Sequence, residues 1–357
     1  MNIALVYPHG NSLRTPDAIG FHLARELAER GHRVRTYNLR SFESSDVPLD
    51  RSEWILLGHP TWRLEDTFYQ LWSLGDWKQV SALCPFCPGD PRTYGYLGIV
   101  SKYVDTFSAI TGEYWRDQCS ATVFAPLADF FDHIDLAVNT ESYPTVDQED
   151  VKTRDSRKWL YVGNHAHFKN LGYLNRLAKQ LPEIEFHRIG PVKRKYRSLI
   201  QHGPSDLLSD EFLKIATSCR FLITPGIADA NPTVILEAMA LGLIPVAPPE
   251  SGYYPSSGVL PIFGDSLSRD LQLIRDYAAL DGETVMELIS NNNKMLASRF
   301  NWVRFTDDIL RSLSSRSHLG FVSSSRYWPY FFRNKLSPFR FERFIQHCAK
   351  KSRGANR

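Results

Sequence analysis

The sequence lacks the features that define several protein classes. No run of 18 or more apolar residues occurs among its 357 residues, which excludes a transmembrane helix. The opening segment 1–8 has neither a basic region nor a long apolar region, so we expect no signal peptide. Cysteine is scarce, and its odd number of five describes no disulfide framework. These absences favour a protein of the reducing cytoplasm.

The common nucleotide and metal motifs are also missing. Neither Gly-x-Gly-x-x-Gly nor Gly-x-x-x-x-Gly-Lys-Ser/Thr appears, so dehydrogenase and P-loop functions lose their main support. No Asp-x-Asp follows an expected strand end, which argues against metal-dependent phosphate binding. Cys84 and Cys87 form a single Cys-x-x-Cys, but zinc needs four ligands and no second Cys/His pair has matching spacing. We therefore expect no cofactor and no metal site.

The formal charge of +3 hides an uneven distribution. The tail, residues 316–357, holds ten Lys or Arg and one Glu, whereas residues 1–315 hold 32 basic and 38 acidic side chains. An acidic body disfavours nucleic acid as a partner. The tail interleaves basic with aromatic residues, a pattern that suits an anionic membrane surface. A tail that packs partly over the first domain is the alternative, and the sequence leaves both open.

The first half of the chain has an α/β pattern. Short apolar runs predict strands at 3–7, 33–37 and 54–57, with weaker elements at 80–83, 106–110 and 121–125. Thr15 predicts a helix N-cap with Pro16 at the first helical position, and Gly31 predicts the end of that helix. Strand, helix and strand at this spacing predict a parallel sheet.

A second α/β pattern follows a polar stretch. Residues 139–158 have almost no apolar periodicity, which predicts a linker or a domain boundary. Strands are then expected at 159–162, 183–189, 221–223 and 243–247, with helices between them, one of which Ser209 would cap. We therefore predict a domain of residues 1–145, a second domain of residues 146–315, and the tail.

The segment 224–247 carries the most specific chemistry. It follows an expected strand and opens a helix, with Asn231 as the expected N-cap and Pro232 at the first helical position. Free backbone N–H groups and the positive end of the helix dipole bind phosphate readily. Asp229 and Glu237 flank this start, and their carboxylates suit the hydroxyls of a sugar and a ribose. An ordinary capped helix with one buried acid is the alternative.

This segment resembles the donor-binding signature of GT-B glycosyltransferases, especially the family 4 group of retaining enzymes. In that group two glutamates lie eight positions apart, and the second begins the pattern Glu-Ala-Met-Ala-x-Gly-x-Pro-Val. This chain has Glu237-Ala-Met-Ala-Leu-Gly-Leu-Ile-Pro-Val, with one extra residue before the proline, and Asp229 in place of the first glutamate. The resemblance implies a GT-B fold, in which two Rossmann-like domains face a cleft.

Weaker matches follow in the family's order. Gly163 and Lys169 match the strand, glycine, loop and lysine that open the family's C-terminal domain, although Asn164 stands where the family has an arginine. The segment 300–305 is similar to the start of the late helix that crosses back to the first domain.

The resemblance also implies roles for single residues. Glu237 would bind the ribose and Lys169 the diphosphate, while Asp229 would bind the donor sugar as a catalytic residue. The loop after the strand at 159–162 would add Gly163 and Asn164 to the donor-binding residues. The helix start would add Asn231, Thr233 and Val234. A lysine and a helix start can stabilise the leaving diphosphate without a metal.

The first domain departs further from the family. Its loop after the first strand has one glycine, Gly10, where members often have a pair that lets the backbone approach the donor. A histidine of this domain commonly lies near the reacting sugar; His59, at a strand end, is the leading candidate and His9 the second. The segment 83–87, which holds Cys84 and Cys87, is another candidate for that position and would leave catalysis without a histidine.

Together these features predict a cytoplasmic glycosyltransferase of polysaccharide biosynthesis. It would move a sugar from a nucleoside-diphosphate-sugar to a hydroxyl of a glycan or lipid-linked glycan, with retention, without a metal, and with peripheral membrane contact through the tail. Two alternatives stay open. One is a non-catalytic subunit that binds a nucleotide-sugar, and the other is a nucleotide-sugar epimerase on the same fold.

Overall fold

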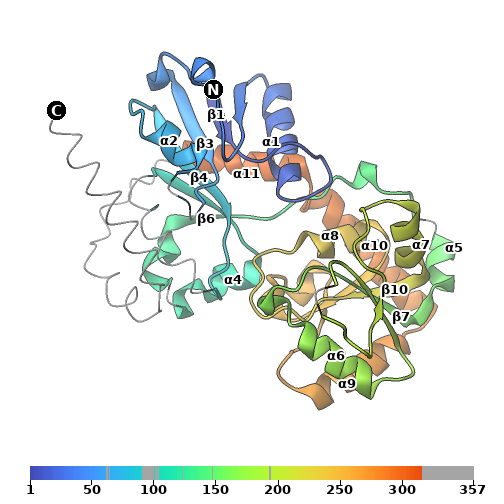
Figure 1. Cartoon of the computed structure of the whole chain (residues 1–357). Coiled ribbons are helices and arrows are strands. Elements are labelled where there is room, and N and C mark those ends of the chain that lie inside the picture. Colours follow the sequence, from blue (N-terminus) through green and yellow to red (C-terminus); the bar gives the residue numbers. More distant parts are fainter. Residues whose placement is uncertain are drawn as a thin grey trace.

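The computed structural model describes residues 1–315 apart from residues 62, 64, 91–99, 101–103, 123, 147 and 193, and the side chains of 126, 127, 148 and 149. The described part forms two parallel six-stranded sheets with helices packed on their faces (Figure 1). The predicted α/β class and the two-sheet arrangement are confirmed. The predicted tail, residues 316–357, lies outside the described residues.

The first sheet contains the strands expected at the start of the chain, in the order β2-β1-β3-β4-β5-β6. These strands are β1 (Asn2–Val6), β2 (Arg33–Tyr37), β3 (Trp54–Gly58), β4 (Gln79–Pro85), β5 (Thr106–Ile110) and β6 (Phe131–Ile134). The element expected at 121–125 is not a strand, because short 3-10 turns, η4 (Cys119–Ala121) and η5 (Ala125–Phe130), precede β6. Apolar residues buried on both faces hold β1 and β3 in the centre, as expected for parallel strands.

Helices α1 (Asp17–Glu29), α2 (Thr67–Trp72) and α4 (Glu113–Gln118) belong to this first domain. Helix α1 packs through Ile19, Leu23 and Leu27, and Gly31 follows it with a φ of +79°, as predicted. Its predicted start is wrong by one residue, because Pro16 is the N-cap and Thr15 does not cap the helix. The Thr15 hydroxyl instead lies 2.9 Å from the Thr233 hydroxyl of the second domain.

The second sheet has the order β12-β11-β10-β7-β8-β9. Its strands are β7 (Asp155–Val162), β8 (Glu185–Ile189), β9 (Ile200–Gln201), β10 (Cys219–Ile223), β11 (Ile244–Ala247) and β12 (Leu260–Pro261). Its helices are α5 (Gln148–Thr153), α6 (Leu171–Gln180), α7 (Asp210–Ser218), α8 (Thr233–Ala240), α9 (Leu267–Ala278) and α10 (Gly282–Ser298). Trp159, buried between Phe186 and Phe221, marks its core, and Ser209 caps α7 as predicted.

The stretch expected as a linker is more ordered than its composition indicates. Residues 139–158 contain a 3-10 turn, η6 (Thr140–Ser142), then helix α5 and the first residues of β7. Val151 is fully buried in the core of the second domain and Arg154 is buried too. The composition of this stretch therefore does not predict helix α5, because two buried side chains anchor a polar segment. The expected linker or domain boundary stays a prediction.

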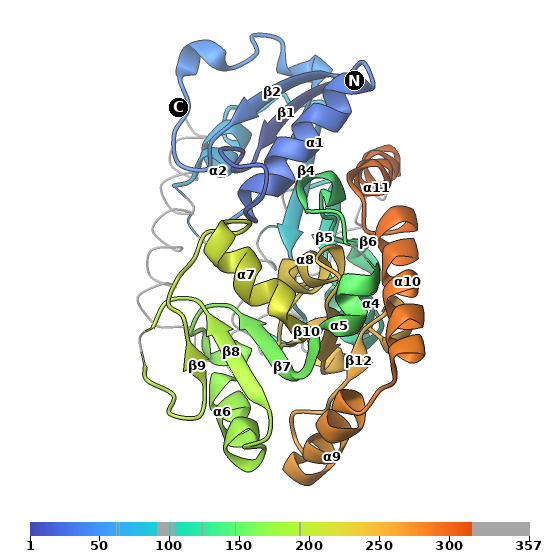
Figure 2. The ribbon, with the colours of Figure 1, turned by 90° about the vertical axis from the view of Figure 1, so that its right-hand side faces the viewer.

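The chain crosses between the domains twice. It passes to the second domain after β6 and returns after α10, and the Val138 N–H donates to the Phe300 carbonyl at 3.1 Å where the crossings meet. Helix α11 (Trp302–Ser314) then packs on the first sheet, as expected for the segment 300–305 (Figure 2). Its Ser312 hydroxyl donates to Asp132 at 2.5 Å. The predicted division at residues 145 and 146 stays a prediction.

Candidate functional site

The two domains meet along the carboxyl ends of their strands. Ligands of open α/β sheets bind at such edges, because the loops after the strands gather there. A narrow cleft at this junction is lined from both domains, with Ser12, Thr15 and Tyr143 on one side and Thr233 on the other. The segment 224–247 therefore lies where its sequence predicts, at the start of α8 and facing the first domain.

The start of α8 differs by one residue from the prediction. Pro232 is the N-cap and Thr233 the first helical residue, and no side chain caps the helix. Asn231 does not cap it because its side-chain oxygen accepts a hydrogen bond from the Tyr253 hydroxyl. Within the described residues, the N–H groups of Thr233 and Val234 have no hydrogen-bond acceptor, and the buried amide nitrogen of Asn231 has none. This end of the helix therefore offers several free donors to an anion.

Lys169 and Asp229 form an ion pair across sixty residues of sequence. Lys169 ends a 3-10 turn, η7 (His167–Lys169), and Asp229 lies in the loop between β10 and α8. A backbone hydrogen bond from Ile227 N–H to the Phe168 carbonyl, 2.9 Å long, ties the two loops together. The Lys169 side chain is 16% exposed and the Asp229 side chain is 15% exposed, so a ligand can reach both.

Glu237 completes the predicted cluster on the second turn of α8. Burial raises the pKa of its carboxyl group to about 7, and the nearby Lys169 ammonium lowers that pKa only in part. No hydrogen bond to this carboxylate is present in the described part of the chain. A partly buried acid without a hydrogen-bond donor is costly, so this position suits a ligand hydroxyl that would supply one.

Gly163 and Asn164 shape the loop after β7. Gly163 packs tightly, since a Cβ there would lie 2.7 Å from the Tyr161 hydroxyl. The Asn164 side chain accepts the Ala166 N–H at 2.9 Å, which stabilises the loop. Its expected contact with the donor stays a prediction.

Arg188 on β8 is not among the residues that the sequence predicts for the site. It is fully buried, and its guanidinium donates to the His165 ring at 2.9 Å and to the Pro191 carbonyl at 2.7 Å. Its Nε–H has no acceptor in the described structure. An arginine inside a buried strand was the available signal, because such a cation is rare without a partner. Arg188 therefore brings positive charge beneath the loop that holds Asn164.

His59 follows the end of β3 and is partly buried. Burial lowers the pKa of His59 to about 4, and a backbone hydrogen bond with Leu83 opposes this only in part. Its ring lies 5.6 Å from the Tyr7 ring. Among the described residues no hydrogen bond, ion pair or ring contact joins His59 to Asp229. The structure therefore brings together Lys169, Asp229 and Glu237, and the expected catalytic role of His59 stays a prediction.

The other first-domain candidates also lie in loops. The His9 ring is 2.9 Å from the Tyr7 carbonyl oxygen. Gly10 is exposed, and a Cβ there would meet no atom within 4 Å, so the described fold does not require glycine at this position. Its expected role in donor binding stays a prediction.

Two first-domain residues that do reach the cluster are Trp115 and Cys87. The Trp115 indole N–H donates to the Asp229 carbonyl at 2.9 Å. Burial, with a smaller contribution from the nearby Asp229 carboxylate, raises the pKa of the Cys87 thiol to about 12. Cys87 ends the segment 83–87, which the resemblance offers as an alternative position for the first-domain catalytic group.

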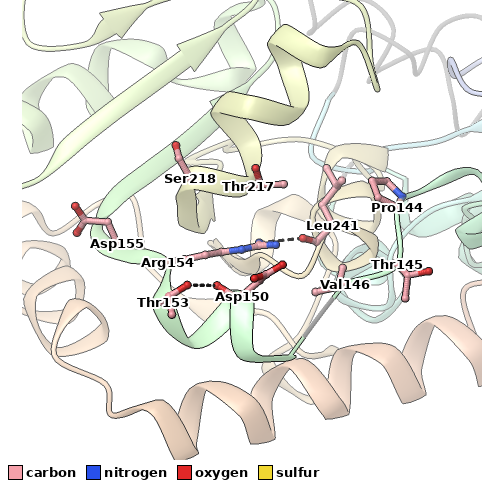
Figure 3. Close-up of a pocket in the computed structure, with 10 residues that line it drawn as sticks. All are labelled: Pro144, Thr145, Val146, Asp150, Thr153, Arg154, Asp155, Thr217, Ser218 and Leu241. Atoms are coloured by element: carbon pink, nitrogen blue, oxygen red, sulfur yellow. Dashed lines mark hydrogen bonds between the residues drawn. The ribbon is translucent and has the colours of Figure 1, made fainter.

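A larger cavity lies at the opposite edge of the second sheet. It has a volume of about 480 Å³ and is lined by α5, the start of β7 and the ends of α7 and α8 (Figure 3). The buried Arg154 guanidinium donates to the carbonyls of Leu241 at 2.9 Å and Gly242 at 3.1 Å. A cation at the C-terminal end of α8 stabilises the helix whose other end faces the cleft.

In the described ranges no group of three or more His, Cys, Asp or Glu side chains is arranged to hold a metal ion. None of the helices described is both long and apolar enough to cross a membrane.

Comparisons with known proteins identify the fold. No protein-family model and no curated protein sequence matches the chain. Among solved structures, sucrose-phosphate synthase from Thermosynechococcus elongatus superposes with a TM-score of 0.63 at 15% identity, over 87% of this chain and 98% of that one. Anabaena HepE in complex with UDP and glucose gives 0.61 at 13% identity, over 88% and 99%. An alpha-glucosyltransferase in complex with UDP and DNA gives 0.61 at 9% identity, over 88% and 99%.

The class that the fold defines is therefore GT-B, the two-domain fold shared by these structures. The predicted GT-B fold is confirmed. Membership of the family 4 group stays a prediction, because these identities are too low to show more than the fold.

Proposed function

We propose that the protein is a glycosyltransferase that transfers a sugar from a nucleoside-diphosphate-sugar to a hydroxyl group. The observation that carries this proposal is the meeting of Lys169, Asp229 and Glu237 at the start of α8. A cation and free helix N–H groups suit a diphosphate, and two carboxylates suit hydroxyl groups. The similarity to structures solved with UDP supports the same use of this site.

Each charged group has a task in this proposal. The donor diphosphate binds Lys169 and the N–H groups of Thr233 and Val234, which stabilise the negative charge that grows as the sugar leaves. Glu237 accepts hydrogen bonds from the ribose. The family resemblance adds retention of configuration to the proposal. The lack of an Asp-x-Asp after an expected strand end favours independence of metal, and the basic aromatic tail favours a glycan or lipid-linked glycan as acceptor.

The ion pair gives the donor a second effect. Lys169 is paired with Asp229, and a diphosphate carries more negative charge than one carboxylate. Binding of the diphosphate therefore weakens the hold of Lys169 on Asp229. The carboxylate is then available to the hydroxyls of the donor sugar, next to the leaving group.

A thermal-shift screen with UDP, GDP, ADP and their sugars tests this proposal. A nucleotide at one hundred times its Kd stabilises the fold by about 2.7 kcal/mol, so the right one raises Tm by several degrees. Glu237→Ala should remove this shift, whereas Glu287→Ala, at an exposed position on α10, should keep it. A screen with no shift, or an unchanged shift in Glu237→Ala, contradicts the proposed site.

Turnover assays separate the enzyme from its alternatives. A glycosyltransferase releases nucleoside diphosphate when an acceptor is present. A nucleotide-sugar epimerase consumes donor without any acceptor. A non-catalytic subunit binds nucleotide but turns over nothing. Asn164, Asp229 and the single glycine of the first loop, Gly10, favour this alternative because they depart from the family pattern.

A further inference from the structure

A short segment of the first domain reaches into the loop that carries Asp229. The segment consists of Gly112 and the first residues of helix α4. It lies at the side of the first domain that faces the second (Figure 1). The Trp115 indole N–H lies 2.9 Å from the Asp229 carbonyl oxygen and 3.0 Å from that of Glu250. The Gly112 N–H donates to the Ala230 carbonyl at 2.8 Å. Two consecutive carbonyls of the loop are therefore held by the other domain.

The fit around Trp115 is close. Its side chain is 6% exposed, and a Cβ on Gly89 would overlap the indole ring. A Cβ on Gly112 would overlap the carbonyl of Gly252 in the second domain. Neither Gly89 nor Gly112 leaves room for a larger side chain, and this close packing fixes the position of the segment.

An ion pair beside this contact holds the domains in the same arrangement. Arg299, at the end of α10, binds both carboxylate oxygens of Asp135 at 2.6 and 2.9 Å. It also pairs with Glu113, the first residue of α4, at 3.0 Å. The cation of one domain therefore joins two acids of the other, and one of those acids lies two residues from Trp115.

Every polar group of Asp229 has a partner in this arrangement. Its N–H donates to the Glu250 carbonyl at 3.0 Å, its side chain pairs with Lys169, and its carbonyl accepts from Trp115. The first two partners belong to the second domain, so only the third depends on how the domains are placed. A directional indole N–H fixes the peptide plane, and the peptide plane sets where the side chain starts.

We propose that Trp115 is a positioning residue, which couples the placement of the Asp229 carboxylate to the approach of the two domains. This inference rests on the proposed function and names a partner of the same site. The groups assigned to the nucleotide, Lys169, Glu237 and the start of α8, all belong to the second domain. Nucleotide affinity is therefore independent of Trp115, whereas turnover depends on it.

The substitution Trp115→Phe tests this separation, because it removes the N–H and keeps most of the ring. We expect kcat for sugar transfer, or for donor hydrolysis by water, to fall ~10- to 100-fold, since small misplacements of reacting groups cost this much. The Kd for UDP, measured by calorimetry, should stay within about twofold. Trp77→Phe is the matched control, because the Trp77 indole N–H donates to the Leu71 carbonyl at 2.8 Å within the first domain. It should leave both quantities unchanged.

A second variant disturbs the same contact between the domains and leaves the indole ring unchanged. Gly112→Ala pushes α4 away from Gly252 and should lower kcat in the same way, with UDP affinity kept. The inference is overturned if Trp115→Phe keeps its kcat, or if UDP affinity falls as much as kcat does. If the wild-type protein binds no nucleoside diphosphate, the proposed function itself fails. If the wild type transfers sugar and Trp115→Phe matches it, only the role of Trp115 fails.

Discussion

The two domains contribute to the cleft by different kinds of chemistry. The second domain supplies charged side chains, the ion pair of Lys169 with Asp229 and the raised pKa of Glu237. The first domain supplies an uncharged group, the indole N–H of Trp115. The difference indicates that binding of an anionic donor is the task of one domain, whereas the other provides geometry.

The largest expected effect comes from removing the only cation of the predicted cluster. Lys169→Met should weaken UDP binding and lower kcat/KM by about 10²- to 10³-fold, the size of loss seen when one stabilising group of a transition state is removed. Calorimetry with UDP and initial rates check this. Lys214→Met, at an exposed position on α7, is the control and should change neither. A Lys169→Met protein that binds UDP normally would place the diphosphate elsewhere.

A smaller effect concerns stability and its pH dependence. The folded-state pKa of Glu237 is raised to about 7 from an ordinary 4.5, so the folded state binds more protons than the unfolded state between these values. The free energy of unfolding therefore falls as pH rises through this window, by up to about 3 kcal/mol. Glu237→Gln removes this cost and should be more stable than wild type at pH 8.

Urea unfolding at pH 4 and pH 8 measures this difference. The gain of Glu237→Gln should be present at pH 8 and absent at pH 4, where both forms carry a neutral group. Glu287→Gln, at the exposed position on α10, should show no such gain. An equal gain at both pH values would mean that charge burial is not its cause.

The smallest effect is expected in the first domain. With a pKa of about 4, His59 is neutral throughout pH 5–8 and gains no proton in that range. His59→Phe keeps a ring of similar size beside Tyr7 and should change kcat by less than about threefold, with the same pH profile. A loss of a hundredfold, or a changed pH profile, would restore His59 as a catalytic group and remove the contrast between the domains.

Much of the fold and the charged cluster could be predicted because their signals are local. Apolar runs predict the strands. Pro232 predicts the start of α8, and Asp229 and Glu237 on either side of it predict the charged cluster. Ion pairing of Lys169 with Asp229 was not predicted, although both were named, because it depends on how two loops meet in space.

The errors come from contacts between distant parts of the chain. Asn231 fails to cap α8 because its side chain bonds Tyr253, which lies 22 residues later. Helix α5 forms in a polar stretch because its Val151 side chain is buried in the core of the second domain. Trp115 had no motif to mark it, since its partners, Asp229 and Glu250, lie more than a hundred residues away. Such contacts leave no periodic or spacing pattern in a single sequence.

The return of α11 to the first sheet has a consequence for the order of folding. Phe305 and Ile309 of this helix are buried against the first domain, and the Ser312 hydroxyl forms hydrogen bonds with Ser108 and Asp132. The ribosome makes the first sheet early but the helix that covers it only after the whole second domain. The domain that comes first in the printed sequence therefore finishes folding last, and until then its uncovered face is open to chaperones and to aggregation.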